Sequence, residues 1–491
     1  MQDCETAKGL QRAPGLRKKG VPAMKNVGKI LKWTGVVILA ILVLLPAINA
    51  VDERLAPEVA ELGSVPAPIP PGENAYFAIF GFQAPSGEDM HARGVEMVAE
   101  YEKIIQADPT SQAVLFPVAM LGEKRLQLVG GGKDLCHSAP DPYRCLAYYL
   151  GRSAETTRIL ADNTLMLDRY VQLIAYPHFQ ETLPPVTATA FNITSPIRTA
   201  HQLFLAKIAM HVKNGKTSAA LAMIRQDTVF LRRMAAEGNA LLGKLVAFSL
   251  LSADIRALSE IISLQKLTPA DIVMANNIVQ PLTDQERSLA RVCQFEARYV
   301  RNLVSTMARD GNASILQGLS EPTKSGEPGV VSRVGQFFFR LFFKPNATFN
   351  IAGRTFIDVM ALDAMKGPDY SARLKERRGL TVERDRSRIR LDMVYNPVGK
   401  FYIDAAVQVL YGYSRRGHDL DGLMRLVALK VLVKQKAVPD SQVEHLLGTA
   451  GPRYADPYAS RPMQWDGKKR CIYFNGMNES FELKQRVEVL L

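Results

Sequence analysis

Apolar residues recur at helical spacing through most of this chain. Val95, Val98, Tyr101 and Ile105 fall on one face of a helix that we expect over residues 94–107. Capping residues, prolines and glycines mark the ends of further helices. We expect these helices over residues 153–176, 195–213, 217–237, 239–264, 283–309, 405–413, 420–434 and 440–447, with another beginning at Thr268.

Two of these helices are expected to form a hairpin. Ser195 and Pro196 begin the first helix, and Asn214 and Gly215 end it in a left-handed turn. Helices of about twenty residues joined by so short a turn must pack as antiparallel neighbours. Gly215 and Ala220 match a tetratricopeptide unit, but no second copy follows at its ~34-residue period. The body is therefore predicted to be TPR-like or irregular α.

The carboxyl-terminal part of the chain has a different pattern. Residues 461–474 centre on Asp466 and Gly467, a dipeptide typical of a two-residue turn, and residues 471–474 form the return strand. The predicted fold is mainly α. It combines one N-terminal transmembrane helix, a body of helical hairpins and a small C-terminal β-hairpin.

The most apolar stretch lies near the amino terminus. Residues 33–51 contain no charged side chain. Nineteen residues of helix extend about 28 Å, close to the ~30 Å hydrocarbon core of a bilayer. Lysines precede this stretch and Asp52 and Glu53 follow it, so the positive-inside rule places the tail in the cytoplasm and the body outside it. The residues expected to anchor the helix are Trp33, Val36, Leu39, Leu42 and Leu45.

A cleaved signal peptide is the alternative. Pro46 would break the helix just before Ala47–Ala50, and Met24 offers a later start for a short basic region. Ile48 is larger than the small residue usual at that place in a cleavage site, which favours an uncleaved anchor. Both interpretations export the body, either on a single-pass inner-membrane anchor or as a secreted periplasmic protein.

The net charge of +13 is concentrated at one end of the chain. Residues 1–32 hold eight Lys or Arg and two acids, which leaves +7 on all the other residues. That density is ordinary for a soluble body, and no zinc finger or aromatic-basic RNA motif is present. We therefore expect no nucleic-acid partner.

The cysteine positions agree with export. Cys136 and Cys145 enclose a turn-rich loop whose ends can approach to disulfide distance, so we expect a bridge between them. Cys293 and Cys471 would pair by elimination, since Cys4 lies in the cytoplasmic tail. Four buried thiols are the alternative. No CxxC or paired Cys/His spacing predicts a metal site.

Changes in composition divide the chain. Alternating Pro and Ala over residues 65–72 favour a semi-rigid spacer, and residues 310–332 are rich in Gly, Ser, Pro and Asn. The expected parts are a basic cytoplasmic tail (1–32), a signal-anchor (33–51), a Pro-rich spacer (52–73), a helical domain (74–309), a linker (310–332) and a mainly helical C-terminal domain ending in the β-hairpin (333–491).

Five phenylalanines lie within residues 334–343. A core helix whose aromatic side chains pack inward is the favoured interpretation, because aromatic residues occupy nearly every face of so short a run. The alternative is an interfacial helix on the anionic membrane. Its lipid contacts would come from Phe337, Phe338, Phe342 and Arg340.

Motifs of catalysis and cofactor binding are absent from the sequence. There is no GxSxG, HExxH or strand-linked GxGxxG, and Gly130–Lys133 lacks the spacing of a phosphate-binding loop. In the cluster His418, Asp419 and Asp421, a carboxylate beside an imidazole could perform acid–base chemistry. A structural role at helix ends is favoured for this cluster: Gly417 would end one helix and an aspartate would cap the next. We expect no cofactor and no metal.

Short segments spread over the body form a specific set: Asn74–Tyr76, Gly81–Pro85, Asp168–Tyr170, Tyr176–Pro177, Lys344–Thr348, Asn396–Lys400, His418–Gly422 and Asp456–Tyr458. Together they resemble a family of proteobacterial inner-membrane-anchored envelope proteins with no assigned activity. The resemblance covers most of the exported body and implies a periplasmic location, but it transfers no catalytic role. The stretch before Met24 departs from the family pattern.

Three functions are compatible with this sequence. A non-catalytic binding or scaffold protein is favoured, because helical hairpins without a catalytic constellation commonly present grooves to partners. Another envelope protein is then an expected partner besides the inner membrane. A periplasmic hydrolase of an envelope polymer, with a carboxylate pair from distant segments, is the first alternative. A lipid-binding peripheral module is the second.

Overall fold

The structure is a computed structural model that describes residues 24–107, 120–136, 141, 143–185, 194–310, 330–386, 391–407, 409–477 and 483–491. The chain divides into two compact units, Met1–Val51 and Asp52–Leu491. Helices dominate the described residues, and their strands all lie in the last part of the second unit. The predicted mainly helical fold is confirmed.

The first unit contains helix α1, Met24–Ile48. Its segment Leu31–Ile48 is long and apolar enough to cross a membrane, and none of that segment is buried. It is the one such helix among the described residues. α1 continues through Pro46, so the proline does not end the helix as expected. The predicted anchor residues all lie on α1: Trp33, Val36, Leu39, Leu42 and Leu45.

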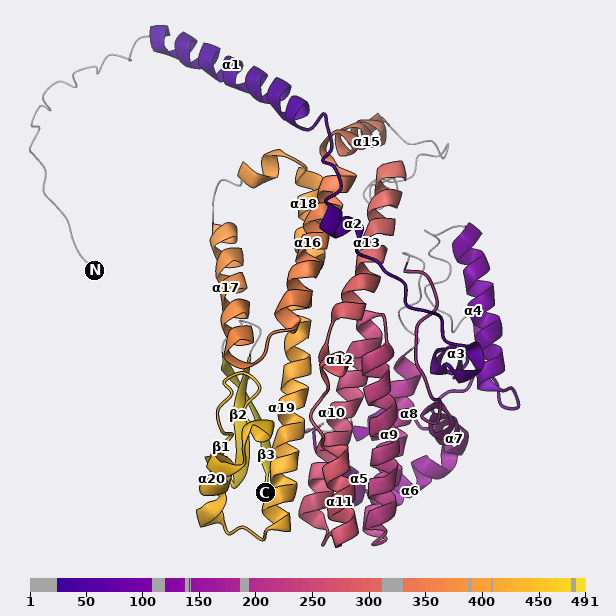
Figure 1. Cartoon of the computed structure of the whole chain (residues 1–491). Helices are drawn as coiled ribbons and strands as arrows, with labels where there is room; N and C mark the ends of the chain where they lie inside the picture. Colours follow the sequence, from indigo (N-terminus) through magenta and orange to yellow (C-terminus); the bar gives the residue numbers. More distant parts are fainter. Residues whose placement is uncertain are drawn as a thin grey trace, which may run out of the picture. The chain divides into compact units, whose positions relative to one another are not determined.

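The second unit is built from helices that run side by side and from a small sheet (Figure 1). Its helices are α2 (Pro57–Ala60), α3 (Ala75–Phe80), α4 (Met90–Ala107), α5 (Cys145–Gly151), α6 (Ser153–Asp162), α7 (Thr164–Leu173), α8 (Ser195–Lys213), α9 (Thr217–Glu237), α10 (Leu241–Leu264), α11 (Pro269–Ile278), α12 (Asp284–Arg287), α13 (Ala290–Asp310), α15 (Val330–Phe342), α16 (Pro345–Asp363), α17 (Gly367–Arg386), α18 (Pro397–Val407), α19 (Val409–Gln435) and α20 (Asp440–Thr449). Its strands are β1 (Gln464–Asp466), β2 (Cys471–Met477) and β3 (Leu483–Leu490).

Several predicted helix ends are confirmed by local geometry. α8 and α9 form the expected hairpin, and Gly215 between them has a φ of +69°, a conformation that side chains disfavour. Capping boxes begin two further helices. Thr268 pairs with Asp271 at α11, and Thr283 pairs with Glu286 at α12.

Two expected helices are interrupted by polar contacts. The helix expected over residues 153–176 is divided at Asn163, whose side-chain amide donates to the carbonyl of Ile159 over 2.8 Å and so competes with the helical N–H for that acceptor. The helix expected after the second capping box is divided between α12 and α13. There the N–H of Leu289 donates to Oδ2 of Asp363 over 2.7 Å.

Helix α19 shows that the predicted break at Gly417 is wrong. The expected helices 405–413 and 420–434 are replaced by α18 and by one unbroken α19. A Cβ at Gly417 would stand 2.8 Å from Cγ of Arg287, so the glycine permits close packing and does not end a helix. Asp419 and Asp421 are therefore interior residues of α19 and not caps.

The C-terminal sheet contains the predicted hairpin and one further strand. Asp466 of β1 pairs with Cys471 of β2 across the expected turn. β3, which was not expected from the sequence, pairs antiparallel with β2, giving the order β1-β2-β3. The sheet packs against α19.

Two hydrophobic clusters form the interior of the second unit. The larger cluster contains residues of helices α3–α11, of α19 and of the sheet. The smaller cluster contains residues of α2, α13, α15, α16 and α18. Each cluster draws on segments from both sides of the predicted linker. Residues 311–329 of that linker lie outside the described residues.

Candidate functional site

One of the two predicted disulfides is present. Cys136 and Cys145 are bridged, with their Cα atoms 5.3 Å apart. The prediction of a second bridge is wrong, because Cys293 and Cys471 are unpaired and buried. Cys293 lies on α13 in the smaller core, whereas Cys471 lies on β2, where Arg486 donates to its Sγ over 2.9 Å. Pairing by elimination failed because it used no spatial information.

His418 is buried and Asp419 is partly buried, and each contacts a tyrosine. The His418 ring packs on Tyr370 with their centroids 3.9 Å apart, and burial lowers the pKa of His418 to about 3. Asp419 accepts a 2.7 Å hydrogen bond from the hydroxyl of Tyr458, and burial raises its pKa to about 6. These contacts join α19 to α17 and to the segment before the sheet.

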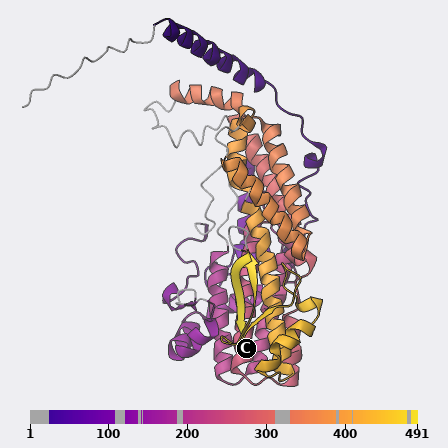
Figure 2. The ribbon, with the colours of Figure 1, turned by 90° about the vertical axis from the view of Figure 1, so that its left-hand side faces the viewer.

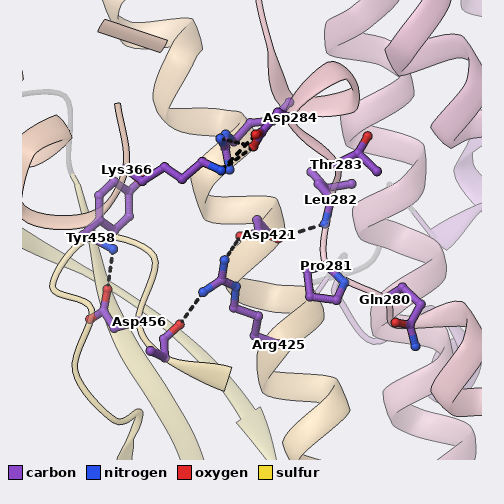
Figure 3. Close-up of polar contacts among 12 residues, drawn as sticks. Gln280, Pro281, Leu282, Thr283, Asp284, Lys366, Asp421, Arg425, Asp456 and Tyr458 are labelled. Atoms are coloured by element: carbon purple, nitrogen blue, oxygen red, sulfur yellow. Dashed lines mark hydrogen bonds and ion pairs between the residues drawn. The ribbon is translucent and has the colours of Figure 1, made fainter. Parts of the chain in front are cut away.

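Asp421 has a structural role in the same region (Figure 3). Its Oδ1 accepts from the N–H of Leu282 over 2.9 Å, and its Oδ2 lies 2.6 Å from Arg425. Arg425 in turn donates to the carbonyl of Ala455 over 2.9 Å. Asp421 is 1 % exposed, and these contacts connect α19 to the segments that contain Leu282 and Ala455.

The segments that carry the family resemblance bond to one another. Arg169 is buried and donates to the carbonyls of Phe82 and Pro85, each over 2.9 Å. Asn396 donates to Oγ1 of Thr348 over 3.0 Å, and both side chains are buried. Buried hydrogen bonds of this kind fix neighbouring loops. These residues therefore maintain the fold.

The phenylalanines of residues 337–343, in α15 and just after it, divide between the interior and the surface. Phe339 and Phe343 are 7 % and 3 % exposed and belong to the smaller core. Phe337 and Phe338 are 64 % and 51 % exposed, and Arg340 on the same helix is also exposed. Inward packing, the favoured interpretation from the sequence, thus fails for Phe337 and Phe338.

A cavity with several polar lining residues lies between α5, α8 and α10, which contact one another. It has a volume of about 470 Å³, within the range of ligand-binding pockets. Its lining is formed by two arginines, hydroxyl groups, an amide and a few other side chains: Tyr143, Cys145, Ser195, Arg198, Thr199, Gln202, Ser249, Leu250, Ser252, Ala253, Arg256 and Glu260. We call this cavity the arginine cleft.

Neither arginine of the arginine cleft forms an ion pair with another described residue. Arg198 is exposed and forms no ion pair there. Arg256 stacks on the ring of Tyr143, with Cζ 4.4 Å from the ring centroid. Its Nε is buried without a hydrogen-bond partner among the described residues, and burial lowers its pKa. A buried donor left without an acceptor is costly, so the site favours an acceptor from a ligand.

The single acid of the arginine cleft is already bonded. Glu260 accepts from the N–H groups of Leu146 (3.1 Å) and Ala147 (2.9 Å), at the amino-terminal end of α5. The bridged Cys145 is the first residue of α5, so the disulfide lies directly beside this contact. The carboxylate therefore positions α5, and it forms no ion pair with either arginine of the cleft.

A second cavity of about 270 Å³ adjoins the arginine cleft and shares Tyr143, Arg256 and Glu260 with it. Lys430 of α19 lines this cavity, and its Nζ donates to Ser259 and Ser263. Burial lowers the pKa of Lys430 to about 7. Residues of β3 complete the lining.

The sequence analysis missed the arginine cleft, although two patterns could have indicated it. Ser195, Arg198, Thr199 and Gln202 follow one another at helical spacing on α8, which is otherwise largely buried. A second polar stripe on α10 contains Ser249, Ser252, Arg256 and Glu260. Polar stripes on mostly apolar helices mark a surface that the core does not use.

Two buried carboxyl groups line a separate small cavity. Glu181 and Glu296 share it with Tyr76, Phe179 and Phe295, and its volume is about 60 Å³. Burial raises the pKa of each glutamate to about 7. Ligand-binding pockets are several times larger, so the carboxyl pair has no room for a sugar unit.

A buried polar cluster lies where α7, α8, α9 and α10 contribute side chains. His201, Asp227 and Asp254 are each 0 % exposed. Nε2 of His201 lies 3.0 Å from Oδ1 of Asp254 and 3.5 Å from Oδ2 of Asp227, and the hydroxyl of Tyr170 donates to Asp227 over 2.9 Å. The sequence analysis missed this cluster because its members come from four helices.

The buried cluster has a donor set that suits a divalent cation. One ligand atom from each of His201, Asp227 and Asp254 lies within 4.8 Å of the others. A shared proton provides another arrangement, because burial raises the pKa of both aspartates. Burial also lowers the pKa of His201, which favours a neutral imidazole. The expectation of no bound metal stays a prediction.

Comparison of the chain with protein-family models, with curated proteins and with solved structures finds no match.

Proposed function

We propose that this protein is a non-catalytic binding protein of the bacterial envelope. α1 holds it in the inner membrane, and the arginine cleft of the periplasmic body binds an anionic, hydroxyl-bearing ligand. The observation that carries this proposal is Arg256, which lines a 470 Å³ cavity, forms no ion pair among the described residues and has a buried Nε without a hydrogen-bond partner there.

The location is supported by three independent features. α1 is long and apolar enough to span a bilayer, and cations precede it. The bridge between Cys136 and Cys145 is typical of an oxidising compartment outside the cytoplasm. The resemblance to inner-membrane-anchored envelope proteins points to the same compartment.

The lining of the cleft defines the chemical class of the ligand. Guanidinium groups bind carboxylates and phosphates through paired charge-assisted hydrogen bonds. The hydroxyl groups of Ser195, Thr199, Ser249 and Ser252 can donate to and accept from sugar hydroxyls. An acidic saccharide fragment of an envelope polymer combines both groups.

The number and positions of the carboxyl groups in the cavities favour binding over hydrolysis. Glycoside hydrolysis generally uses two carboxyl groups that flank the scissile bond. The arginine cleft contains only Glu260 among its lining residues, and both of its carboxylate oxygens accept backbone hydrogen bonds. The pair Glu181 and Glu296 lies in a cavity too small for a substrate.

The test is ligand binding by the full-length protein in detergent, measured by calorimetry. The probes are an oligogalacturonate, a phosphorylated oligosaccharide and a neutral oligosaccharide of equal length, which distinguish carboxylate from phosphate. We expect Arg256→Gln to weaken anion binding about tenfold or more, because a charge-assisted hydrogen bond contributes about 1.5–3 kcal/mol.

The matched control is Arg225→Gln, which removes an exposed arginine from the neighbouring helix α9. It should leave the affinity unchanged. The proposal would be contradicted if both variants lost the same amount of affinity, or if the wild-type protein bound neither acidic probe. Shortened oligosaccharides in the mixture would instead support the hydrolase.

A further inference from the structure

The strongly exposed phenylalanines of the body gather in two contacting helices. Among the described residues of the second unit they are Phe337 (64 %), Phe338 (51 %) and Phe401 (69 %). Phe337 and Phe338 lie on α15, and Phe401 lies on α18, which packs against α15. Three large aromatic side chains left in water at one place indicate a surface that another apolar phase covers.

The chain enters the body beside these helices. Asp52 is the first residue of the second unit, and it accepts hydrogen bonds from the N–H groups of Asn346 (2.8 Å) and Ala347 (3.1 Å). Both N–H groups belong to the first turn of α16, which begins at Pro345, directly after α15. Asp52 thus caps α16. A bilayer that holds residues 33–51 must therefore come close to this end of α16.

We infer that α15 and the adjoining Phe401 lie in the interface of that bilayer, with Phe337 and Phe338 inserted among the lipid headgroups. The inference rests on the membrane anchoring in the proposed function and adds a second, independent contact with the same membrane. Phe339 and Phe343 attach α15 to the smaller core, so the helix is held with its opposite side chains outward.

The charges around α15 favour an anionic bilayer over a second copy of the chain. Residues 330–344 contain Arg333, Arg340 and Lys344 and no acid; Arg340 is exposed, whereas Lys344 is buried. Anionic phospholipids attract such a segment. Two copies facing each other through α15 would instead place like charges opposite one another.

This contact would orient the body on the membrane. In both views α15 and α18 lie at the end of the body opposite the sheet (Figures 1 and 2). β3 lines the cavity that adjoins the arginine cleft. The cleft is therefore held toward the end that points away from the bilayer.

The first test uses the full-length protein in nanodiscs that contain brominated phospholipids, which quench nearby tryptophan. The parent carries Trp33→Phe, so that Trp465 is the common baseline. Phe338→Trp is compared with the control Val273→Trp on α11. In the wild-type protein Val273 is also an apolar residue at the surface, with 60 % of it exposed. We expect at least about twofold stronger quenching for Phe338→Trp, because interfacial side chains lie at the acyl boundary. Equal quenching would overturn the inference.

The second test uses the body, residues 52–491, which is a compact unit with both hydrophobic clusters of its own. Flotation with vesicles containing anionic lipid should fall about tenfold for the double variant Phe337→Ser and Phe338→Ser. Arg340→Glu should remove the preference for anionic over zwitterionic vesicles. Circular dichroism checks that each variant is folded. Unchanged flotation of the double variant would also overturn the inference.

Failure of the anchor is measured separately. Release of the full-length protein from membranes by alkaline carbonate would contradict the membrane anchoring in the proposed function. If the protein stays in membranes after carbonate treatment but Phe338→Trp and Val273→Trp are quenched equally, only the interfacial contact of α15 would be overturned.

Discussion

At the scale of single residues, burial decides what the polar side chains do. His418 and Asp421 sit in the interior of α19, where each is 1 % exposed and surrounded by packed neighbours. Their motif predicted chemistry or a helix cap, because sequence patterns do not show that two helices and a loop cover them. Arg256 differs because it lines a cavity. Its Nε is buried and lacks an acceptor among the described residues.

A substitution at Asp254 tests how the buried cluster is stabilised. In the shared-proton arrangement, Asp254→Asn supplies an amide N–H that can donate to Asp227 in place of the proton, and its carbonyl can still accept from His201. We therefore expect the free energy of unfolding at pH 8 to be unchanged or higher. Asp254→Leu removes both partners and should lower it by roughly 2–4 kcal/mol.

Urea unfolding measures these differences, and elemental analysis of the purified protein accompanies it. If the wild-type protein carried one divalent metal per chain and Asp254→Asn lost it together with stability, the shared-proton arrangement would be wrong and a metal site would replace it.

At the scale of elements, short-range constraints are well predicted and long-range ones are not. The hairpin of α8 and α9 follows from a cap, a left-handed glycine and periodicity, all of which are local. The strand β3 was missed because its pairing with β2 depends on a partner outside its own sequence. The arginine cleft depends in the same way on two polar stripes that meet only when α8 and α10 pack.

The disulfide is the element whose removal is easiest to measure. Cys136→Ser with Cys145→Ser opens a loop of sequence separation 9. The loop-closure entropy predicts a loss of about 2–3 kcal/mol in the free energy of unfolding. Because Cys145 begins α5, the variant should also weaken ligand binding in the arginine cleft.

The measurement is urea unfolding of the double variant beside wild-type protein with and without reductant. Reduced wild-type protein should match the variant. A variant as stable as the oxidised protein would show that the bridge does not constrain the loop.

At the scale of the whole molecule, the two hydrophobic clusters are built from segments distant in sequence. The cavity of Glu181 and Glu296 lies where they adjoin, since Tyr76 and Phe179 belong to the larger cluster and α13 contributes to the smaller. The connection between the clusters therefore contains two carboxyl groups whose pKa burial raises to about 7.

This junction makes stability depend on pH. A folded-state pKa of about 7 exceeds the ordinary value of 4.5, so the folded protein holds its proton more tightly than the unfolded chain. The contribution is complete below pH 4.5 and is lost as the pH rises to about 7. Glu296→Gln removes one titrating group, so the fall in unfolding free energy between pH 5 and pH 8 should shrink by roughly 1–3 kcal/mol.

Urea unfolding at both pH values gives this difference, with Glu444→Gln on the exposed face of α20 as the control. The pH dependence of the control should equal that of the wild-type protein. An unchanged pH dependence in Glu296→Gln would show that this carboxyl group does not titrate between the folded and unfolded states as expected.

The sequence by itself determined the features that depend on neighbouring residues. These are the apolar helix α1, the mainly helical class, the caps of α11 and α12, the bridge between Cys136 and Cys145 and the turn at Asp466. Hydrophobic periodicity, capping and short loop closure act over a few residues, so each can be recognised in the chain alone.

Only the tertiary structure decided which distant groups meet. It separated Cys293 from Cys471, buried His418, brought His201 to Asp227 and Asp254, and left Phe337 exposed beside the entry of the chain. The physical reason is that burial and long-range contact come from packing whole helices against one another. The same local pattern becomes core, site or surface according to what covers it.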